Sequence, residues 1–436
     1  MAPWWCWASP VVDANGDTRR RPTLRGHDGG DSLARTITLV RHGETISNTS
    51  GRWQGQSDSP LSERGERQVE LLRHRVAGRQ PHLLISSDLG RTRTTCEAIG
   101  QGEALVEWRE FDLGEWDGMR PDEIRAKYPE VDNERFGSSD FQPAGGERFS
   151  DFIRRVRGAF DRLATRVDDG EEAIAVTHGG VIQTIVGSLV GAVDQSGMLV
   201  PSNTSITTVR IDGDRTEVFS YNDDLHLNGD ASRPTGTRLR LIRHGETHAN
   251  LEHRWWGRGE TPLSTDGHRQ VVALAETGMT LDAVAASPSG RAQQTATPVA
   301  ERNGLPIQTV DDLVELHFGE WEGLTGAEAR AEDPETFHRI FAEGRDEPRG
   351  RTGERFVDAG ERFAAAADAL AQNENGTVGV FTHGGVMRAY VAGMLGIPFA
   401  VRDVIPIPRN TAHCEIIYAA DGPRVSSYNV ATHLGD

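Results

Sequence analysis

LVRHGETISN at residues 39–48 is the stretch that decides the fold of this chain, and LIRHGETHAN at residues 241–250 repeats it. Each copy begins with a short run of apolar and β-branched residues, which is typical of a buried strand. In each copy Arg-His-Gly follows that run directly. The repeated stretch therefore predicts the same strand twice, with the same polar residues where the strand ends.

The repetition extends over most of the chain. Four further segments recur in the same order at separations between 200 and 207 residues: 51–69 and 253–271, 110–118 and 315–323, 176–182 and 381–387, and 220–227 and 427–434. A period this long indicates the duplication of whole domains, because the units of solenoid proteins are only about 20–50 residues long. We therefore expect one domain at residues 35–228 and a second at 237–435.

Two segments fall outside the repeats. Residues 229–236 are rich in turn-forming residues and are expected to form a linker between the domains. Residues 1–34 precede the first copy and have no counterpart in the second. We expect them to be a disordered N-terminal tail.

Strand-like runs alternate with helical stretches in both copies. This alternation predicts the α/β class: two tandem three-layer α/β/α domains, each with a mostly parallel central sheet flanked by helices. Ligands of such sheets bind beyond the carboxyl ends of the strands. The Arg-His-Gly segments and the Thr-His-Gly-Gly segments at 177–180 and 382–385 follow strand-like runs, so we expect them to lie beside one another there.

The charge balance limits the possible partners. The 436 residues include 65 acidic and 47 basic side chains, which gives a net charge of −18. Such a chain repels nucleic acid and anionic membranes, and it contains no apolar run of about 18 residues that would cross a membrane. A phosphate site in this protein must therefore gather its own cations.

Lysine and cysteine usage exclude other chemistry. Lys127 is the only lysine, so a P-loop is excluded and Schiff-base chemistry is disfavoured. Cys6, Cys96 and Cys414 are far apart and odd in number, which predicts neither a disulfide framework nor a zinc knuckle. The N-terminus lacks the basic start of a secretory signal, and we expect a cytoplasmic protein.

Four motifs together suggest a family. Each copy contains RHGET-x-x-N, then an arginine before a helix, then Glu-x-x-x-Gly-Glu-Trp-x-Gly, and finally THGG. In this order the motifs resemble the histidine phosphatase (phosphoglycerate mutase-like) superfamily, and they do so twice, over nearly the whole chain. The resemblance is to the phosphatase-type branch.

The resemblance implies roles for individual residues. In the first copy His42 is the nucleophile that accepts the phosphoryl group, and Glu110 protonates the leaving oxygen and then activates water. The resemblance also makes His178 a catalytic residue of this copy, and it makes Arg41, Asn48 and Arg91 phosphate-binding residues. The second copy matches in full, with catalytic His244, Glu315 and His383 and phosphate-binding Arg243, Asn250 and Arg291.

These residue types suit phosphoryl transfer. The transition state spreads negative charge over the phosphoryl oxygens, so catalysis consists mainly of positioning and cationic stabilisation. Arginine binds two phosphate oxygens at once, and a neutral imidazole is a suitable nucleophile near pH 7. Because arginines and histidines can stabilise the phosphoryl oxygens, we expect neither a metal nor a cofactor.

The predicted function is hydrolysis of small phosphorylated metabolites through a phosphohistidine at two complete sites. Two alternatives stay open: a phosphoglycerate-type mutase, and a regulatory module that only binds a phosphorylated ligand. Mutases of this family carry extended insertions that exclude water, whereas segments 119–144 and 324–352 are short here. The sequence leaves open a monomer or a homodimer, and duplication makes an intramolecular pairing of the two domains conceivable.

The two copies differ at the edges of their motifs. The differing pairs are Ile46 and His248, Gln54 and Trp256, Asp88 and Pro288, and Gln183 and Arg388. Specificity is expected to be set at these positions, so we predict that the two sites prefer different substrates or successive phosphates of one substrate.

Overall fold

The computed structural model describes residues 34–129, 140–192, 197–227 and 235–435. The predicted tail, except for its last residue, and residues 229–234 of the predicted linker lie outside the described residues. Both predicted domains lie largely within the described ranges.

The first half of the chain forms a six-stranded sheet in the order β3-β2-β4-β1-β5-β6. Its strands are β1 (Arg35–Arg41), β2 (Leu83–Ser87), β3 (Glu103–Leu105), β4 (Glu172–Thr177), β5 (Ile206–Asp212) and β6 (Arg215–Asp223). Strands β3, β2, β4 and β1 are parallel, whereas β5 pairs antiparallel with β1 and β6 pairs antiparallel with β5. Arg41 pairs with Thr177, so the residues that follow these two strands emerge side by side at the carboxyl edge.

The second half repeats this sheet. Its strands are β7 (Thr237–Arg243), β8 (Ala283–Ala286), β9 (Ile307–Thr309), β10 (Thr377–Thr382), β11 (His413–Ala419) and β12 (Gly422–Val430). The pairing of Arg243 with Thr382 reproduces that of Arg41 with Thr177. The motifs that the sequence repeats are therefore placed at equivalent edges of two equivalent sheets.

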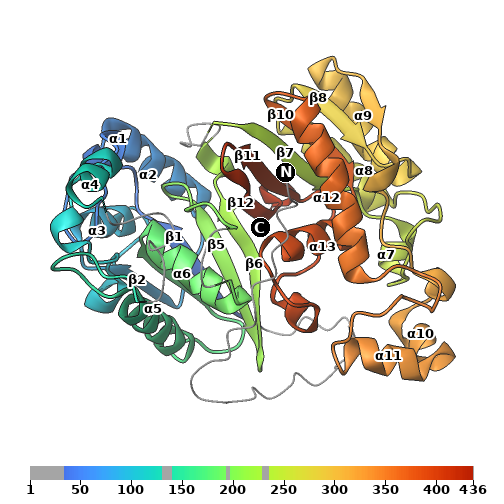
Figure 1. Ribbon diagram of the computed structural model, residues 1–436, viewed down its shortest axis with the longest axis horizontal. Coiled ribbons are helices and arrows are strands. Elements are labelled where there is room, and N and C mark those ends of the chain that lie inside the picture. The colour runs from blue at the N-terminus through green and yellow to red at the C-terminus, as the bar shows by residue number, and fades with distance from the viewer. Residues whose placement is uncertain (1–33, 130–139, 193–196, 228–234, 436) are drawn as a thin grey trace.

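The two sheets join edge to edge. Strand β6 pairs antiparallel with β12 at Tyr221 and Tyr428, which makes one sheet of twelve strands. In Figure 1 the two halves lie side by side with β6 and β12 between them. The sequence left an intramolecular pairing of the two domains open, but it did not predict which strands form the joint.

Helices cover both faces of the first sheet. Side chains of α2 (Glu63–Arg75) and α3 (Gly90–Glu97), such as Leu72 and Cys96, pack with Val40 on one face. Side chains of α5 (Phe149–Ala164) and α6 (Gly179–Val190) pack with Ile37 and Leu39 on the other. This alternation along β1 is what a strand buried on both sides requires.

The second half is layered in the same way. Helices α8 (Thr265–Glu276) and α9 (Gly290–Asn303) cover one face, and α12 (Phe356–Asn373) and α13 (Gly384–Met394) cover the other. The side chains beneath α5, α6, α12 and α13 form one continuous apolar core that runs through the joint and includes Tyr221 and Tyr428. The predicted fold of two tandem three-layer α/β domains with mostly parallel sheets is confirmed.

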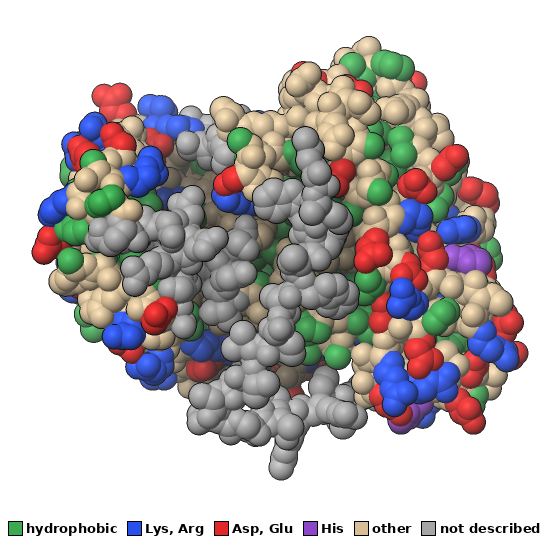
Figure 2. Space-filling view, in the orientation of Figure 1, with side chains coloured by type: hydrophobic (Ala, Val, Ile, Leu, Met, Phe, Trp, Pro, Cys, Tyr) green, Lys and Arg blue, Asp and Glu red, His purple; other side chains and the backbone are tan. Residues whose placement is uncertain are grey.

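Short helices complete the fold. They are α1 (Ile46–Thr49), α4 (Pro121–Lys127), α7 (His248–Leu251), α10 (Gly326–Glu332) and α11 (Pro334–Phe341). Acidic and basic side chains are interspersed over the flanks of the face in Figure 2. No helix in the described part of the chain is long and apolar enough to cross a membrane.

Candidate active site

His42 lies directly after β1, with its ring held by the local backbone. Its amide donates to the carbonyl of Thr177 (2.9 Å), and its Nδ1 lies 2.7 Å from the carbonyl oxygen of Gly43. Since a carbonyl can only accept, Nδ1 carries the hydrogen and the lone pair is on Nε2. A Cβ at position 43 would lie 2.8 Å from Val69 Cγ2 and 3.0 Å from the carbonyl oxygen of Gly65, so only glycine fits after His42.

His178 lies beside His42, after the neighbouring strand β4. The ring centroids are 5.3 Å apart, and the planes are inclined by 64°. Both ring nitrogens of His178 are buried and have no hydrogen-bond partner among the described residues. The ring therefore has a donor to offer to a bound anion.

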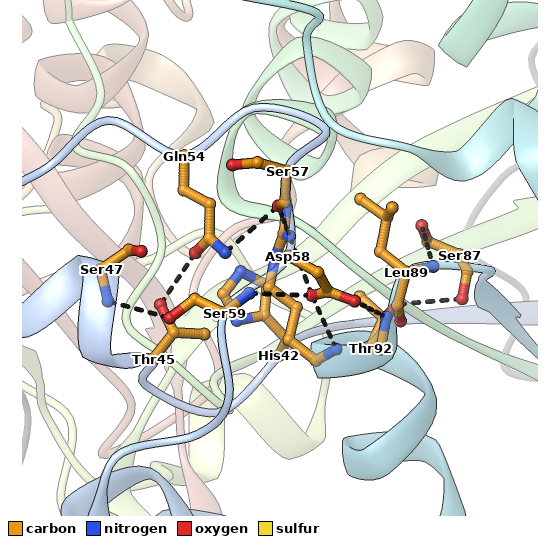
Figure 3. A network of polar contacts seen from close by, with 12 residues as sticks. His42, Thr45, Ser47, Gln54, Ser57, Asp58, Ser59, Ser87, Leu89 and Thr92 are labelled. Carbon is orange, nitrogen blue, oxygen red and sulfur yellow. Dashed lines mark hydrogen bonds and ion pairs between the residues drawn. The ribbon is translucent and has the colours of Figure 1, made fainter. Parts of the chain in front are cut away.

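Two arginines flank these rings. Arg41 donates from Nη1 to the carbonyl of Pro201 (2.6 Å). Arg91, near the start of α3, is 2% exposed and donates to the carbonyls of Gly55 (2.7 Å) and Ser57 (2.8 Å). Figure 3 draws the polar network that includes Ser57, Gln54 and Asp58 together with His42. Fixed backbone carbonyls thus orient the guanidinium groups in advance, while the Nε atoms of both arginines lack a partner among the described residues.

Glu110 lies over the first turn of α6. Its Oε2 accepts from the amide of Gly180 and its Oε1 from the amide of Phe111, both at 2.9 Å. A Cβ at position 180 would lie 2.5 Å from Glu110 Oε1, so the second glycine of THGG is required by the approach of this carboxylate. Glu110 and His178 are thereby held at the same helix start.

The second site repeats this geometry. His244 Nδ1 lies 2.7 Å from the carbonyl of Gly245, and the His244 and His383 centroids are 5.2 Å apart. Arg291 donates to the carbonyl of Gly257 (2.7 Å), and Arg243 to that of Pro408 (2.8 Å). Glu315 Oε2 accepts from the Gly385 amide at 2.9 Å. The structure thus brings together the predicted histidines, arginines and glutamates of both copies.

Asn48 and Asn250 have a local role that the sequence did not predict. The Thr45 amide donates to Asn48 Oδ1 (3.1 Å), and the Asn48 amide donates to Thr45 Oγ1 (3.2 Å), which closes a capping box on α1. Thr247 and Asn250 form the same box on α7. The cap uses the amide oxygen of each side chain, whereas a phosphate contact requires a donor and would come from Nδ2.

Two further asparagines support the backbone at the predicted nucleophiles and were not predicted from the sequence. Asn203 Nδ2 donates to the carbonyl of His42 (2.9 Å), and Asn410 Nδ2 to that of His244 (3.0 Å). Both lie in the sequence Pro-x-Asn-Thr, at 201–204 and 408–411. This short repeat was the available signal, because it recurs at the same separation as the longer motifs.

Burial sets the ionisation of the histidines. Desolvation, followed by the neighbouring arginines, lowers the pKa of His42 and His178 well below the usual value. The same causes lower the pKa of His244 and His383. All four rings are therefore neutral near pH 7, as a nitrogen nucleophile and a neutral donor require.

The arginines are affected by the same burial. Desolvation lowers the pKa of Arg41 and of Arg243 to about 10, while the carboxylates of Glu110 and Glu315 oppose the shift. Both arginines stay charged near pH 7 because their pKa values remain well above it. Among the described residues, no three histidine, cysteine or acidic side chains gather to hold a metal ion.

The edges of the two sites differ. In the first, Asp88 forms a two-pronged ion pair with Arg109 (2.6 and 2.7 Å). Pro288 and Val314 occupy the positions equivalent to Asp88 and Arg109 in the second site. There, His383 Nε2 lies within hydrogen-bond distance of Ser287 Oγ, at 2.8 Å. The first site therefore has a charged pair where the second has apolar side chains.

The sequence model of the histidine phosphatase superfamily (branch 1) matches residues 37–224 and again 239–431. The chain belongs to the histidine phosphatase superfamily. A metal-independent phosphoserine phosphatase of Arabidopsis thaliana is 32% identical over 207 residues, which are 45% of this chain and 85% of that relative.

Other relatives of this chain carry different names. A probable phosphoglycerate mutase of Yersinia enterocolitica is 35% identical over 164 residues, which cover 36% of this chain and 74% of the relative. A bifunctional protein of Mycobacterium tuberculosis is 38% identical over 177 residues, or 39% of this chain. The match spans only about half of that relative's length, 48%. The superfamily is thus established, and its members include both phosphatases and mutase-like proteins.

The buried neutral histidines make stability depend on pH. In the unfolded chain each histidine takes up a proton below about pH 6.5, whereas in the folded chain His178 stays neutral, so the free energy of unfolding falls as the pH falls. Each such histidine contributes up to about 1.4 kcal/mol per pH unit below that value. We expect His178→Gln to reduce the slope of the free energy of unfolding against pH by about this amount between about pH 6 and pH 5. Urea unfolding at a series of pH values measures this slope. His383→Gln is the matched variant in the other domain, and an unchanged slope in both would contradict the burial of neutral rings.

Proposed function

We propose that this protein hydrolyses phosphomonoesters through a phosphohistidine, at two complete active sites. The observation that carries the proposal is the hydrogen bond from Nδ1 of His42 to the carbonyl of Gly43, repeated at His244 and Gly245. It leaves the Nε2 lone pair of each ring free for attack on phosphorus. The arginines and the second histidine around each ring supply donors for the phosphoryl oxygens.

The first step transfers the phosphoryl group to the protein. His42 Nε2 attacks phosphorus, and the bond from phosphorus to the ester oxygen breaks. Glu110, in its protonated form, gives its proton to the leaving oxygen. Arg41, Arg91 and His178 donate to the three outer oxygens, whose charge rises in the transition state. The hydrogen bond to Gly43 stabilises the positive charge that develops on the ring.

The second step regenerates the histidine. Glu110, now a carboxylate, takes a proton from water, and the water oxygen attacks phosphorus as the phosphorus–nitrogen bond breaks. Inorganic phosphate leaves, and both His42 and Glu110 return to their starting forms. His244 and Glu315 perform the same steps in the second site.

Small phosphorylated metabolites are the proposed substrates. The clamp recognises only the phosphate, so the remainder of the substrate is selected at the edges of each site. The charged pair Asp88–Arg109 in the first site and Pro288 with Val314 in the second favour different leaving groups. We therefore propose that the two sites act on different substrates or on successive phosphates of one substrate.

Loss of both nucleophiles is expected to abolish phosphate release. We expect His42→Ala and His244→Ala each to retain the activity of the other site, and the double variant to lose at least about a hundredfold. Phosphate release from a panel of phosphomonoesters is the measurement. A mass increase of the protein that survives acid treatment is not expected, because phosphohistidine is acid-labile. Undiminished release by the double variant would contradict the assignment of His42 and His244 as nucleophiles. An absence of phosphate release by the unaltered protein would leave a ligand-binding module as the better explanation, and identical profiles of the single variants would contradict different substrates.

A mutase is the main alternative, and the name of the Yersinia relative raises it. The segments at 119–144 and 324–352 are short, which favours water as the acceptor; residues 130–139 of the first lie outside the described residues. We expect free phosphate to be released from a phosphomonoester panel with or without added 3-phosphoglycerate. Isomerisation without free phosphate would establish a mutase instead.

Metal independence follows from the proposed roles. Arginines and histidines stabilise the phosphoryl oxygens, so no step requires a divalent cation. We expect phosphate release to be unchanged, within about twofold, after treatment with EDTA. Restoration of a lost activity by Mg²⁺, Mn²⁺ or Zn²⁺ would contradict the mechanism.

A further inference from the structure

The joint between the domains lies against two loops that support the nucleophile positions. We call residues 201–204 and 408–411 the active-site loops. In the first, the Pro201 carbonyl accepts from Arg41 and Asn203 donates to the His42 carbonyl. The loop therefore touches the backbone of the nucleophile and the side chain of a phosphate-binding arginine at once.

Asn222 connects the first active-site loop to the other domain. It lies near the end of β6 and is 3% exposed. Its Oδ1 accepts from the Ser202 amide (2.7 Å), inside the loop of its own domain. Its Nδ2 donates to the carbonyl of Ser426 on β12 (2.7 Å), in the neighbouring domain. One side chain thus bridges a loop and a strand that are far apart in sequence.

Asn429 makes the reciprocal connection. Its Oδ1 accepts from the Arg409 amide in the second active-site loop (2.7 Å), and its Nδ2 donates to the carbonyl of Phe219 on β6 (2.7 Å). Both asparagines have left-handed backbones, with φ of 54° at Asn222 and at Asn429, where the hairpin register shifts. Asparagine tolerates this conformation better than most residues, which suits its repetition in Ser-Tyr-Asn.

The loops need such external support. Thr204 and Thr411 have φ of 59° and 58°, a region that β-branched residues rarely adopt. A backbone held in this conformation persists only where surrounding contacts determine it. The hydrogen bonds of the Asn222 and Asn429 side chains are contacts of this kind. Each side chain forms one bond to the loop of its own domain and one bond to the neighbouring domain.

We propose that Asn222 and Asn429 are positioning residues, each of which uses the neighbouring domain as the support for the loop that orients its own nucleophilic histidine. This inference rests on the proposed phosphohistidine chemistry. It makes the edge-to-edge pairing of β6 with β12 a condition for full activity at both sites. The two domains then depend on one another even if their substrates differ.

The two loops differ in how much other support they receive. The Leu199 amide donates to the Val425 carbonyl, and the Val425 amide to the Gly197 carbonyl, both at 2.9 Å, so the approach to the first loop also pairs with β12. Pro406 stands at the position of Leu199 in the second domain and has no amide hydrogen to donate. We therefore expect the second site to depend more strongly on its asparagine.

The test uses full-length protein with one active site disabled. In the His244→Ala parent, Asn222→Asp keeps the acceptor for the Ser202 amide but places a carboxylate oxygen against the Ser426 carbonyl. In the same parent, Asn222→Gly removes both hydrogen bonds without adding a charge. Both substitutions tolerate the left-handed backbone. We expect kcat for p-nitrophenyl phosphate to fall about tenfold in each. In the His42→Ala parent, Asn429→Asp is expected to cause a larger fall.

Thr432→Val is the matched control. Thr432 Oγ1 donates to Asp223 Oδ2 across the same joint (2.6 Å), beside Asn222 but without contact to the loop. We expect this variant to keep the kcat of the His244→Ala parent within about twofold. An equal loss in Thr432→Val would mean that general loosening of the joint is responsible, and it would overturn the positioning role.

Two readouts separate positioning from stability. If Asn222 acts through the loop, Asn222→Asp lowers kcat by less than about twofold when Asn203→Ala is already present, whereas independent effects would multiply. The ¹H resonance of the His42 Nδ1–H is expected to shift in Asn222→Asp and Asn222→Gly and to stay in place in Thr432→Val. Multiplicative effects or an unmoved resonance would contradict the proposal.

The outcome also distinguishes this proposal from the proposed function. If the His244→Ala parent releases phosphate and the Asn222 variants have the same kcat as that parent, only the positioning role fails. If neither single-site parent forms a phosphohistidine, the proposed function fails and the positioning role fails with it.

Discussion

The hydrogen bond between the Nδ1 of His42 and the carbonyl of Gly43 is the interaction on which the rest of each site depends. Because donor and acceptor belong to adjacent residues, the ring can be aimed only if the backbone of those two residues is rigid. Thr177 accepts from the His42 amide, and Thr95 Oγ1 accepts from the Gly43 amide at 3.0 Å. The sheet on one side and α3 on the other thus fix the peptide that aims the imidazole, and the same bonds recur around His244.

Burial of the charged groups in these sites carries a free-energy cost for folding. Two arginines and two histidines lie close together in each site, and desolvation disfavours the charged form of every one of them. The protein reduces this cost by neutralising the histidines and by surrounding the guanidinium groups with fixed carbonyls such as those of Gly55 and Pro201. These hydrogen bonds are formed within the protein itself, so the proposed mechanism requires little reorganisation of the arginines when phosphate binds.

Duplication has produced one structure from two similar α/β domains. The apolar core beneath α5, α6, α12 and α13 is continuous, and β6 and β12 hide each other's edges in a single sheet. At this side each domain therefore lacks the exposed edge strand that a separate copy would present. The joint is also where Asn222 and Asn429 meet the active-site loops, so the surface that unites the domains is linked to their chemistry.

The sequence alone determined the duplicated α/β architecture and the identity of the charged groups in each site. Those features follow from local patterns: a strand-like run before Arg-His-Gly, and motifs that return about 200 residues later in the same order. Tertiary structure alone decided the capping role of Asn48, the support of the His42 carbonyl by Asn203, and the antiparallel pairing of β6 with β12. The physical reason is that a side-chain amide can serve many partners, and an edge strand can pair with any exposed edge, so only the packed chain selects among them.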